Sequence, residues 1–172
     1  MGYFDKYTDE KIRLLWTGMA EIGVDNYLIN TEKNPHFKFT MYEDLNVNEA
    51  EKAISSIAKI MEKIPIQFKT YSFYPNEKPF ICIDMAVTHS ILDLQADIRG
   101  RCDQFGKLYD INYFDQGIWK PDCQLTIGFG KEKLKKSVEF LSNTELPIDG
   151  IIERIGVIEF HPAKQLSSYE LI

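Results

Sequence analysis

An internal repeat constrains the fold of this chain more than any other feature of its sequence. The segment 35–40 reads Pro-His-Phe-Lys-Phe-Thr and the segment 121–126 reads Pro-Asp-Cys-Gln-Leu-Thr, so a proline, an alternation of polar and apolar residues, and a threonine recur in frame. Two shorter matches that also contain a proline follow in the same order at similar offsets, 64–66 with 146–148 and 73–75 with 160–162. Recurrence in the same order indicates two copies of one supersecondary unit that pack against each other.

The length of the chain sets the size of these copies. Its 172 residues fit one domain, and 44% of them are hydrophobic, which is enough for a packed core. We therefore expect a single bilobal domain whose first repeat covers about 1–78 and whose second repeat covers about 79–172. The two motif strands are expected to face each other across a central cleft, about an approximate two-fold axis.

Hydrophobic periodicity predicts the same order of elements in both halves. Apolar residues at helical spacing predict helices over 8–23, 48–64, 88–106 and 131–141. Thr8 and Thr88 are the expected first residues of the first and third helices. Alternation with a period of two predicts antiparallel strand pairs, 66–74 with 80–87 and 151–160 with 168–172, and a short strand within 1–7. The expected fold class is α+β, internally duplicated, with antiparallel sheets facing the cleft and helices outside.

Each motif strand places three polar residues on one face. Successive side chains of a strand point to opposite faces, so the polar and apolar residues of each motif separate. The expected polar residues are His36, Lys38 and Thr40 in the first strand, and Asp122, Gln124 and Thr126 in the second. The expected buried residues are Phe37 and Phe39 in the first strand, and Cys123, Leu125 and Ile127 in the second. If the two-fold axis is real, the polar residues converge, and convergent polar groups predict a binding or catalytic site. The alternative is an ordinary solvated strand face.

The two motifs resemble the signatures of a known family. The segment 35–39 resembles the first signature of the two-histidine phosphoesterase superfamily, which includes bacterial 2′-5′ RNA ligase-like proteins and cyclic phosphodiesterases, and which reads Pro-His-x-Thr-apolar. The segment 119–125 resembles the second, Trp-x-Pro-His-x-Thr-Leu. The resemblance spans nearly the whole chain. It implies that one histidine acts as general base and the other as general acid on a cyclic phosphate or phosphodiester, while two hydroxyls hold the phosphate oxygens.

The chain departs from that pattern at three of the four functional positions. His36 is retained, whereas Lys38 replaces the first threonine, Asp122 the second histidine and Gln124 the second threonine. One general acid–base side chain typically contributes about 10²–10⁴-fold to rate, so the loss of one histidine predicts a large loss of activity. The resemblance therefore implies a degenerate member with lost or altered phosphoesterase activity, which binds a phosphate-bearing small molecule or an RNA terminus.

Two other interpretations remain open. In the first, the protein is an active phosphodiesterase on 2′,3′-cyclic phosphates or RNA ends, with His36 as the acid, Asp122 as the base and Lys38 as the phosphate clamp. In the second, it is a structural interaction module with a closed cleft. Asp122 is also a candidate to pair with Lys38 or with His36 and so fill the cleft with an ion pair. An ion pair between Lys38 and Asp122 is expected if the two substitutions compensate each other.

Composition limits the partners. Acidic residues outnumber basic ones by 26 to 20, so the formal net charge is −6 and opposes tight, non-specific binding of nucleic acid. The three widely spaced cysteines form no metal-binding pair, and no nucleotide-cofactor motif occurs, so we expect neither metal nor cofactor. The basic run 131–136 is interpreted as a solvated helix face. The sequence contains neither a signal-peptide pattern nor an apolar run long enough for a membrane span, which predicts a cytoplasmic location without membrane contact.

Overall fold

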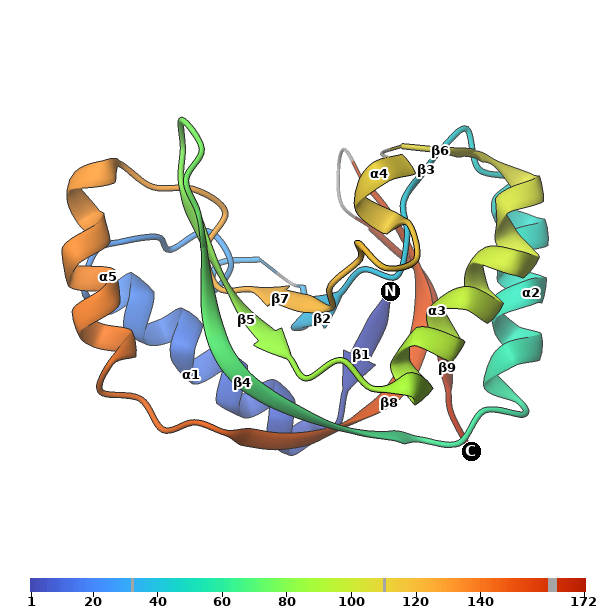
Figure 1. The fold of residues 1–172 in the computed structure, drawn as a ribbon, viewed down its shortest axis with the longest axis horizontal. Coiled ribbons are helices and arrows are strands. Elements are labelled where there is room, and N and C mark those ends of the chain that lie inside the picture. Colours follow the sequence, from blue (N-terminus) through green and yellow to red (C-terminus); the bar gives the residue numbers. More distant parts are fainter. Residues whose placement is uncertain (32, 110, 161–163) are drawn as a thin grey trace.

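The protein folds as one antiparallel sheet with helices outside it (Figure 1). The structure is a computed structural model and describes residues 1–31, 33–109, 111–160 and 164–172. The predicted α+β class is confirmed. The predicted match between 73–75 and 160–162 includes His161 and Pro162, which lie outside the described residues.

Seven strands form the main sheet in the described part of the chain, and their order places the two motifs at its ends. The strands are β1 (Gly2–Phe4), β2 (His36–Phe37), β4 (Ile64–Tyr74), β5 (Phe80–Met85), β7 (Asp122–Gln124), β8 (Ile148–Glu159) and β9 (Lys164–Glu170). The order is β2-β1-β8-β4-β5-β7, with β9 also paired to β8, and every pairing is antiparallel. The outermost strands, β2 and β7, also contact each other, so the sheet curls until its two ends meet. Both predicted strand pairs, β4 with β5 and β8 with β9, are confirmed.

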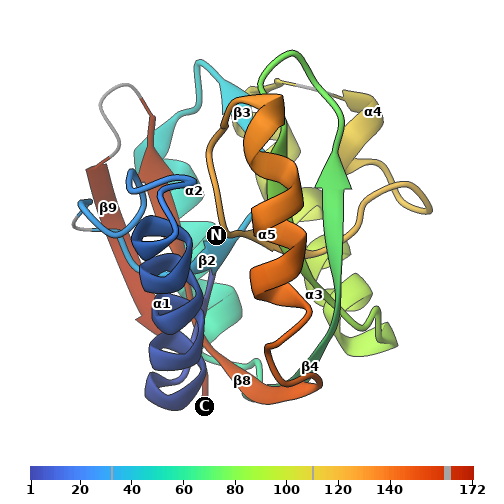
Figure 2. The ribbon, with the colours of Figure 1, turned by 90° about the vertical axis from the view of Figure 1, so that its left-hand side faces the viewer.

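Two helix pairs flank this curled sheet. The helices are α1 (Lys6–Glu21), α2 (Val47–Ala58), α3 (His89–Cys102), the short α4 (Ile111–Phe114) and α5 (Leu134–Leu141). α1 packs against α5 on one side of the molecule, and α2 packs against α3 on the other (Figures 1 and 2). Each pair therefore combines one helix from each half of the chain. A small second sheet, β3 (Tyr42–Glu43) with β6 (Lys107–Leu108), lies beyond the pair α2 and α3.

Helix boundaries follow local capping chemistry, which corrects two expectations. α1 begins at Lys6 because Asp5, not Thr8, is its N-cap, and the Asp5 carboxylate accepts hydrogen bonds from both the backbone N–H and the hydroxyl of Thr8. α2 ends at Ala58, six residues before the expected end. Ile64, the expected last residue of this helix, instead pairs with Ile152 of β8, and Pro65 disfavours the helical conformation at Ile64. Thr88 caps α3 as expected.

The core follows the predicted alternation through Phe39 in the first motif and through Leu125 in the second. Phe37, Phe39 and Leu125 are fully buried, and Phe37 stacks on Phe4 at a ring-centroid distance of 5.8 Å. Ile127 is predicted to be buried, but 43% of it is exposed. β7 ends at Gln124, and the backbone N–H of Ile127 donates to Asp25, so the alternation of the strand no longer applies there.

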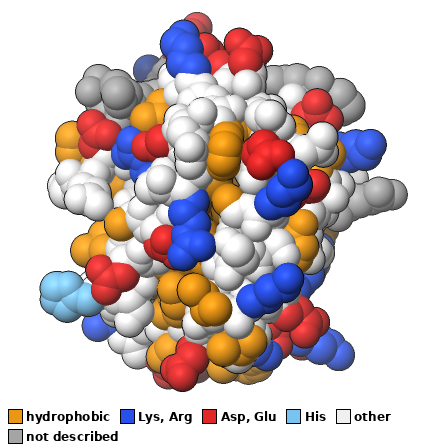
Figure 3. Space-filling model, turned by 90° about the vertical axis from the view of Figure 1, so that its right-hand side faces the viewer, with side chains coloured by type: hydrophobic (Ala, Val, Ile, Leu, Met, Phe, Trp, Pro, Cys, Tyr) orange, Lys and Arg blue, Asp and Glu red, His pale blue; other side chains and the backbone are white. Residues whose placement is uncertain are grey.

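Charges of both signs are interspersed on the face formed by α2 and α3 (Figure 3). Several form ion pairs within one helix, such as Arg101 with Asp97 at 2.7 Å and Lys52 with Glu49 at 2.6 Å. In the described segments, none of the helices combines the length and the apolar character that crossing a bilayer would require.

Candidate functional site

The contact between β2 and β7 brings together side chains that lie 86 positions apart in the sequence. His36 is paired with Tyr3 of β1, and Asp122 is paired with Asp84 of β5. Lys38 is close enough to influence the pKa of both His36 and Asp122, although burial is the larger cause for each. We call His36, Lys38 and Asp122 together the motif cluster, because the charge of Lys38 lowers the pKa of the other two residues.

Two tryptophans hold the motif strands in place. The indole N–H of Trp119 donates to the backbone oxygen of Lys38 at 2.9 Å, and that of Trp16 donates to the backbone oxygen of Gln124 at 2.9 Å. Each hydrogen bond therefore fixes the backbone at the position that a motif threonine occupies in the family signature. Trp119 also packs on Phe39 at 5.9 Å between ring centroids and is 4% exposed, so it belongs to the core. The sequence pattern predicts Trp16 only as a core residue of the first helix.

His36 has the environment of a neutral base. Its Nδ1 lies 2.8 Å from the backbone oxygen of Asn34, and a carbonyl oxygen can only accept, so Nδ1 carries the proton and Nε2 is left as an acceptor. Burial lowers the pKa of His36 to about 4, and the positive charges of Lys38 and Lys33 act in the same direction. At neutral pH the ring is therefore uncharged. This state suits a proton acceptor and opposes the acid role that the active-phosphodiesterase interpretation assigns to His36.

Asp122 is held by tyrosine hydroxyls. Tyr74 of β4 donates to its carboxylate at 2.7 Å, and Tyr113 donates to the same oxygen at 3.4 Å. Burial raises the pKa of Asp122, and the nearby Asp84 also raises it, whereas the hydrogen bond from Tyr74 and the charges of Lys120 and Lys38 oppose this rise. Tyr74 and Tyr113 thus occupy acceptor positions that a ligand group would otherwise compete for.

The ion pair expected between Lys38 and Asp122 does not form within 4.0 Å. Lys120 instead pairs with Asp84 at 2.9 Å, and its ammonium lies 5.6 Å from the centre of the Tyr74 ring. Asp84 also accepts hydrogen bonds from Ser72 at 2.7 Å and Thr70 at 3.3 Å. Sequence reasoning missed Asp84 because the register of β5 with β7 places it beside Asp122, and the sequence pattern does not specify that register.

Two of the predicted substrate-binding residues do not join the motif cluster. Thr126 is fully buried, and its hydroxyl accepts a hydrogen bond from the backbone N–H of Ile81 at 2.8 Å. Thr40 lies beyond the end of β2 and lines a cavity near α2 and α3. Gln124 is paired with Cys82 across β5 and β7 and stays partly exposed. Of the six predicted residues, Thr126 therefore has a structural role and Thr40 belongs to another part of the molecule.

A further cation shares the strand face of His36. Tyr3 of β1 is paired with both His36 of β2 and Arg154 of β8, so the three side chains lie on the same face. The Tyr3 ring is 6.1 Å from the His36 ring, and the Arg154 guanidinium carbon is 5.5 Å from the Tyr3 ring centre. No carboxylate of the described residues comes within 4.0 Å of Arg154. Sequence reasoning missed Arg154 because nothing in the repeat marks it.

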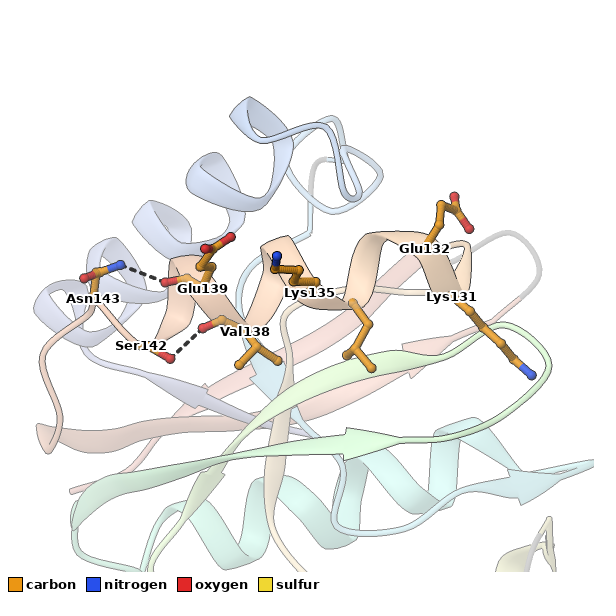
Figure 4. Close-up of a pocket in the computed structure, with 8 residues that line it drawn as sticks. Lys131, Glu132, Lys135, Val138, Glu139, Ser142 and Asn143 are labelled. Carbon is orange, nitrogen blue, oxygen red and sulfur yellow. Dashed lines mark hydrogen bonds between the residues drawn. The ribbon is translucent and has the colours of Figure 1, made fainter.

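The interpretation of the run 131–136 as a solvated helix face holds for Lys131 and Lys135, which are exposed, but not for Lys133 and Lys136. Lys136 donates to the backbone oxygen of Ile22 at 2.6 Å, and Lys133 donates to that of Val24 at 3.1 Å, so both serve the carboxyl-terminal end of α1 and the turn after it. Lys131 and Lys135 line a shallow hollow along α5 with Glu132, Glu139, Val138 and others (Figure 4). All the residues that line this hollow come from one segment, 131–143, so no second element contributes converging groups.

Within the described ranges, no three His, Cys, Asp or Glu side chains gather closely enough to hold a metal ion. No protein-family model matches the chain, and no curated protein matches it.

Proposed function

We propose that this protein is a two-histidine phosphoesterase-like protein that has lost the paired-histidine mechanism and binds a phosphate-bearing ligand at the motif cluster. The observation that carries the proposal is the meeting of the two motif strands. β2 and β7 lie at opposite ends of the strand order and still contact each other, and Lys38 influences the pKa of both His36 and Asp122.

The strand order supports the duplication on which this proposal rests. Read from either end, β2-β1-β8 and β7-β5-β4 run from a motif strand through a neighbouring strand to a long central strand. β4 and β8 pair antiparallel at the centre, with Ile66 opposite Gly150. An approximate two-fold axis through this central pair would exchange the two halves. The interleaved helix pairs agree with such an exchange, because α1 with α5 would map onto α3 with α2.

The side chains favour binding over the standard reaction. Lys38 follows directly after β2, and Arg154 lies in β8. Both side chains are cationic and can donate hydrogen bonds to phosphate oxygens. His36 can accept a hydrogen bond at Nε2 from a hydroxyl of the ligand. Asp122 stands where the family signature has the second histidine, and a carboxylate repels an anionic phosphate. We therefore expect the phosphate to lie on the Lys38 side of the motif cluster.

A second candidate is an active phosphodiesterase with the two roles exchanged. The low pKa of His36 suits a general base, and the raised pKa of Asp122 moves this carboxyl toward the range of a general acid. In this candidate His36 would activate the attacking group and Asp122 would protonate the leaving oxygen. Tyr74 and Tyr113 both donate to Oδ2 of Asp122, so in this candidate Oδ1 would carry the transferred proton.

Calorimetric titration with adenosine 2′,3′-cyclic phosphate and with an RNA oligonucleotide ending in a 2′,3′-cyclic phosphate tests the proposal. We expect saturable binding that Lys38→Met weakens at least about tenfold, because a charge-assisted hydrogen bond is worth roughly 1.5–3 kcal/mol. Lys135→Met is the matched control, since it removes the same charge from the exposed face of α5. Absence of binding to either ligand would favour the interaction-module interpretation. Hydrolysis of either ligand that is lost in both His36→Ala and Asp122→Asn would favour the second candidate.

A further inference from the structure

One edge of β4 has no partner strand along its carboxyl-terminal half. β8 pairs with β4 only as far as Phe68, and β5 pairs with the opposite edge up to Tyr74. No described strand pairs with the β8 side of the range 69–74, and none of these residues is buried. We call this range the open edge. Unpaired strand edges present backbone donors and acceptors with which another extended chain can pair.

The hydrogen bonds of β5 show which backbone groups are free. Ile81 directs its backbone N–H and oxygen toward the β7 side, where both form hydrogen bonds, so the next residue, Cys82, faces β4. Ser72 is the partner of Cys82 and therefore faces β5. Its neighbours Tyr71 and Phe73 direct their N–H and C=O groups to the open edge. No described residue forms a hydrogen bond with these groups.

In the other lobe a strand covers the corresponding edge. β1 and β9 pair with opposite edges of β8 at Arg154, so β9 lies on the same edge as β4 and continues where β4 leaves it. The two-fold exchange proposed above would map β8 onto β4, and β9 onto the open edge. β9 runs antiparallel to β8. The occupant that this comparison indicates is one antiparallel strand.

The two faces of the open edge differ in polarity. Phe73 is paired with Ile81, which is buried in the core, so Phe73 and Tyr71 point to the core side of the sheet. Phe73 is nevertheless 42% exposed. The alternate residues Thr70 and Ser72 point to the other side. Side chains of paired strands lie directly opposite each other, so we expect apolar residues opposite Tyr71 and Phe73, and polar residues between them.

Lysines surround the open edge. Lys69 lies within it, Lys78 lies in the turn between β4 and β5, and Lys131 points toward this turn from the segment before α5 (Figure 4). All three are exposed, and none forms an ion pair within 4.0 Å with a described residue. The turn also contains Glu77. Pairing of this edge with that of a second copy would bring like charges together, whereas carboxylates at the ends of a bound segment would meet opposite charges.

We propose that the open edge binds an extended segment of a partner protein, which adds one antiparallel strand to β4. This segment would alternate apolar and polar residues and carry acidic residues at its ends. Backbone hydrogen bonds to Tyr71 and Phe73 would supply affinity, and the alternate side chains would supply specificity. The open edge contains no residue of the motif cluster, so the inference does not depend on phosphate binding.

The peptide acetyl-Asp-Thr-Val-Thr-Val-Thr-Asp-amide tests this inference on the full chain. We expect saturable binding, followed by NMR, that slows amide hydrogen exchange of Tyr71 and Phe73 at least about tenfold. Exchange of Ser72 should stay slow with and without peptide, because its N–H already bonds to β5. The alternation between neighbouring residues distinguishes strand addition from a general stabilisation of the hairpin.

Two modified peptides test the direction of the hydrogen bonds. Residues directly opposite Tyr71 and Phe73 donate to β4, and in this peptide they are the valines. N-methyl groups on both valines should therefore abolish binding. N-methyl groups on two of the threonines, whose amides would point away from β4, should leave binding close to that of the unmodified peptide.

Variants of the protein test the side chains. Phe73→Thr keeps a strand-forming residue but removes the ring, and should weaken binding about fivefold. Ile151→Thr is the matched control, since Ile151 of β8 is 40% exposed and lies outside the open edge. Lys69→Met should weaken the acidic peptide about threefold and leave the affinity of its Asn-for-Asp analogue unchanged.

The inference is overturned if the unmodified peptide does not bind, or if it binds without slowing exchange at Tyr71 and Phe73. It is also overturned if the peptide with N-methyl valines binds as tightly as the unmodified one. Sedimentation of the free protein tests the other occupant. A dimer in which Tyr71 and Phe73 are already protected without peptide would show that a second copy, and not a partner protein, covers this edge.

Discussion

At the scale of single residues, the ion pair beside β7 is not the expected one between Lys38 and Asp122 but one between Lys120 and Asp84. Lys120 forms an ion pair with Asp84, and the hydroxyls of two tyrosines donate hydrogen bonds to Asp122. Both carboxylates therefore have partners other than Lys38. The positive charge of Lys38 lowers the pKa of His36 and of Asp122. This arrangement leaves Lys38 available for a phosphate.

A pair of double-mutant cycles measures this arrangement. We expect a coupling free energy of about 1 kcal/mol between Lys120→Met and Asp84→Asn, because the pair is in direct contact and Asp84 is only 13% exposed. The cycle between Lys38→Met and Asp122→Asn should give less than about 0.5 kcal/mol, since the two groups are not in contact. Urea unfolding of each variant provides the free energies. A larger coupling free energy for the second pair would mean that Lys38 forms an ion pair with Asp122 and is not available for a phosphate.

The pKa of His36 predicts a pH dependence of stability. Its value of about 4 in the folded protein lies below the ordinary value of 6.5, so the unfolded chain binds more protons between these values. Stability from this residue is complete above about pH 6.5 and falls as the pH drops toward 4, by at most about 3 kcal/mol. Urea unfolding between pH 4.5 and 7.5 should therefore show a steeper decline for the wild type than for His36→Gln. Equal slopes in the two proteins would contradict the neutral, buried state of His36.

At the scale of elements, the sequence predicts types and order better than boundaries. Periodicity locates the four long helices and both strand pairs. The helices and the strands β4, β5 and β8 contribute buried residues to one core, whereas β9 contributes none. The sequence pattern misses Asp5 as the cap of α1 because Thr8 is also a capping residue type, and the contacts of Asp5 with Thr8 and Ile151 become visible only in the structure. The contact between β2 and β7 is predictable from the repeat, whereas Arg154 and Asp84 become neighbours of the motif cluster through strand register, which sequence pattern alone does not specify.

The cap of α1 gives a direct stability prediction. Asp5→Ala should lower the free energy of unfolding by about 1–2 kcal/mol, since Asp5 accepts hydrogen bonds from Thr8 within the first turn and from Ile151 of β8. Glu10→Ala removes a carboxylate from the same end of the helix without a capping role and should cost less than about 0.5 kcal/mol. Thermal or urea unfolding of both variants provides the comparison. Equal effects would show that charge near the helix end, and not capping, stabilises α1.

At the scale of the whole molecule, the curled sheet determines where the two motifs lie. The meeting of its two ends places the motif strands side by side, and indoles from α1 and from the loop before β7 fix the backbone of each. The polar residues of the motifs can therefore change while the frame that holds them is kept. Together with the proposed function, this separation predicts that substitutions at polar residues alone are sufficient to produce phosphoesterase activity.

The most direct measurement is the turnover of a rebuilt protein on adenosine 2′,3′-cyclic phosphate. Lys38→Thr, Asp122→His and Gln124→Thr together restore both His-x-Thr signatures on strands whose buried residues are unchanged. We expect this triple mutant to open the cyclic phosphate, His36→Ala in the same background to abolish turnover, and the wild type to be slower by at least about 10²-fold. A folded triple mutant that fails on cyclic phosphates, or a wild type that matches it, would contradict the proposal that this is a phosphoesterase frame with an overwritten catalytic pattern.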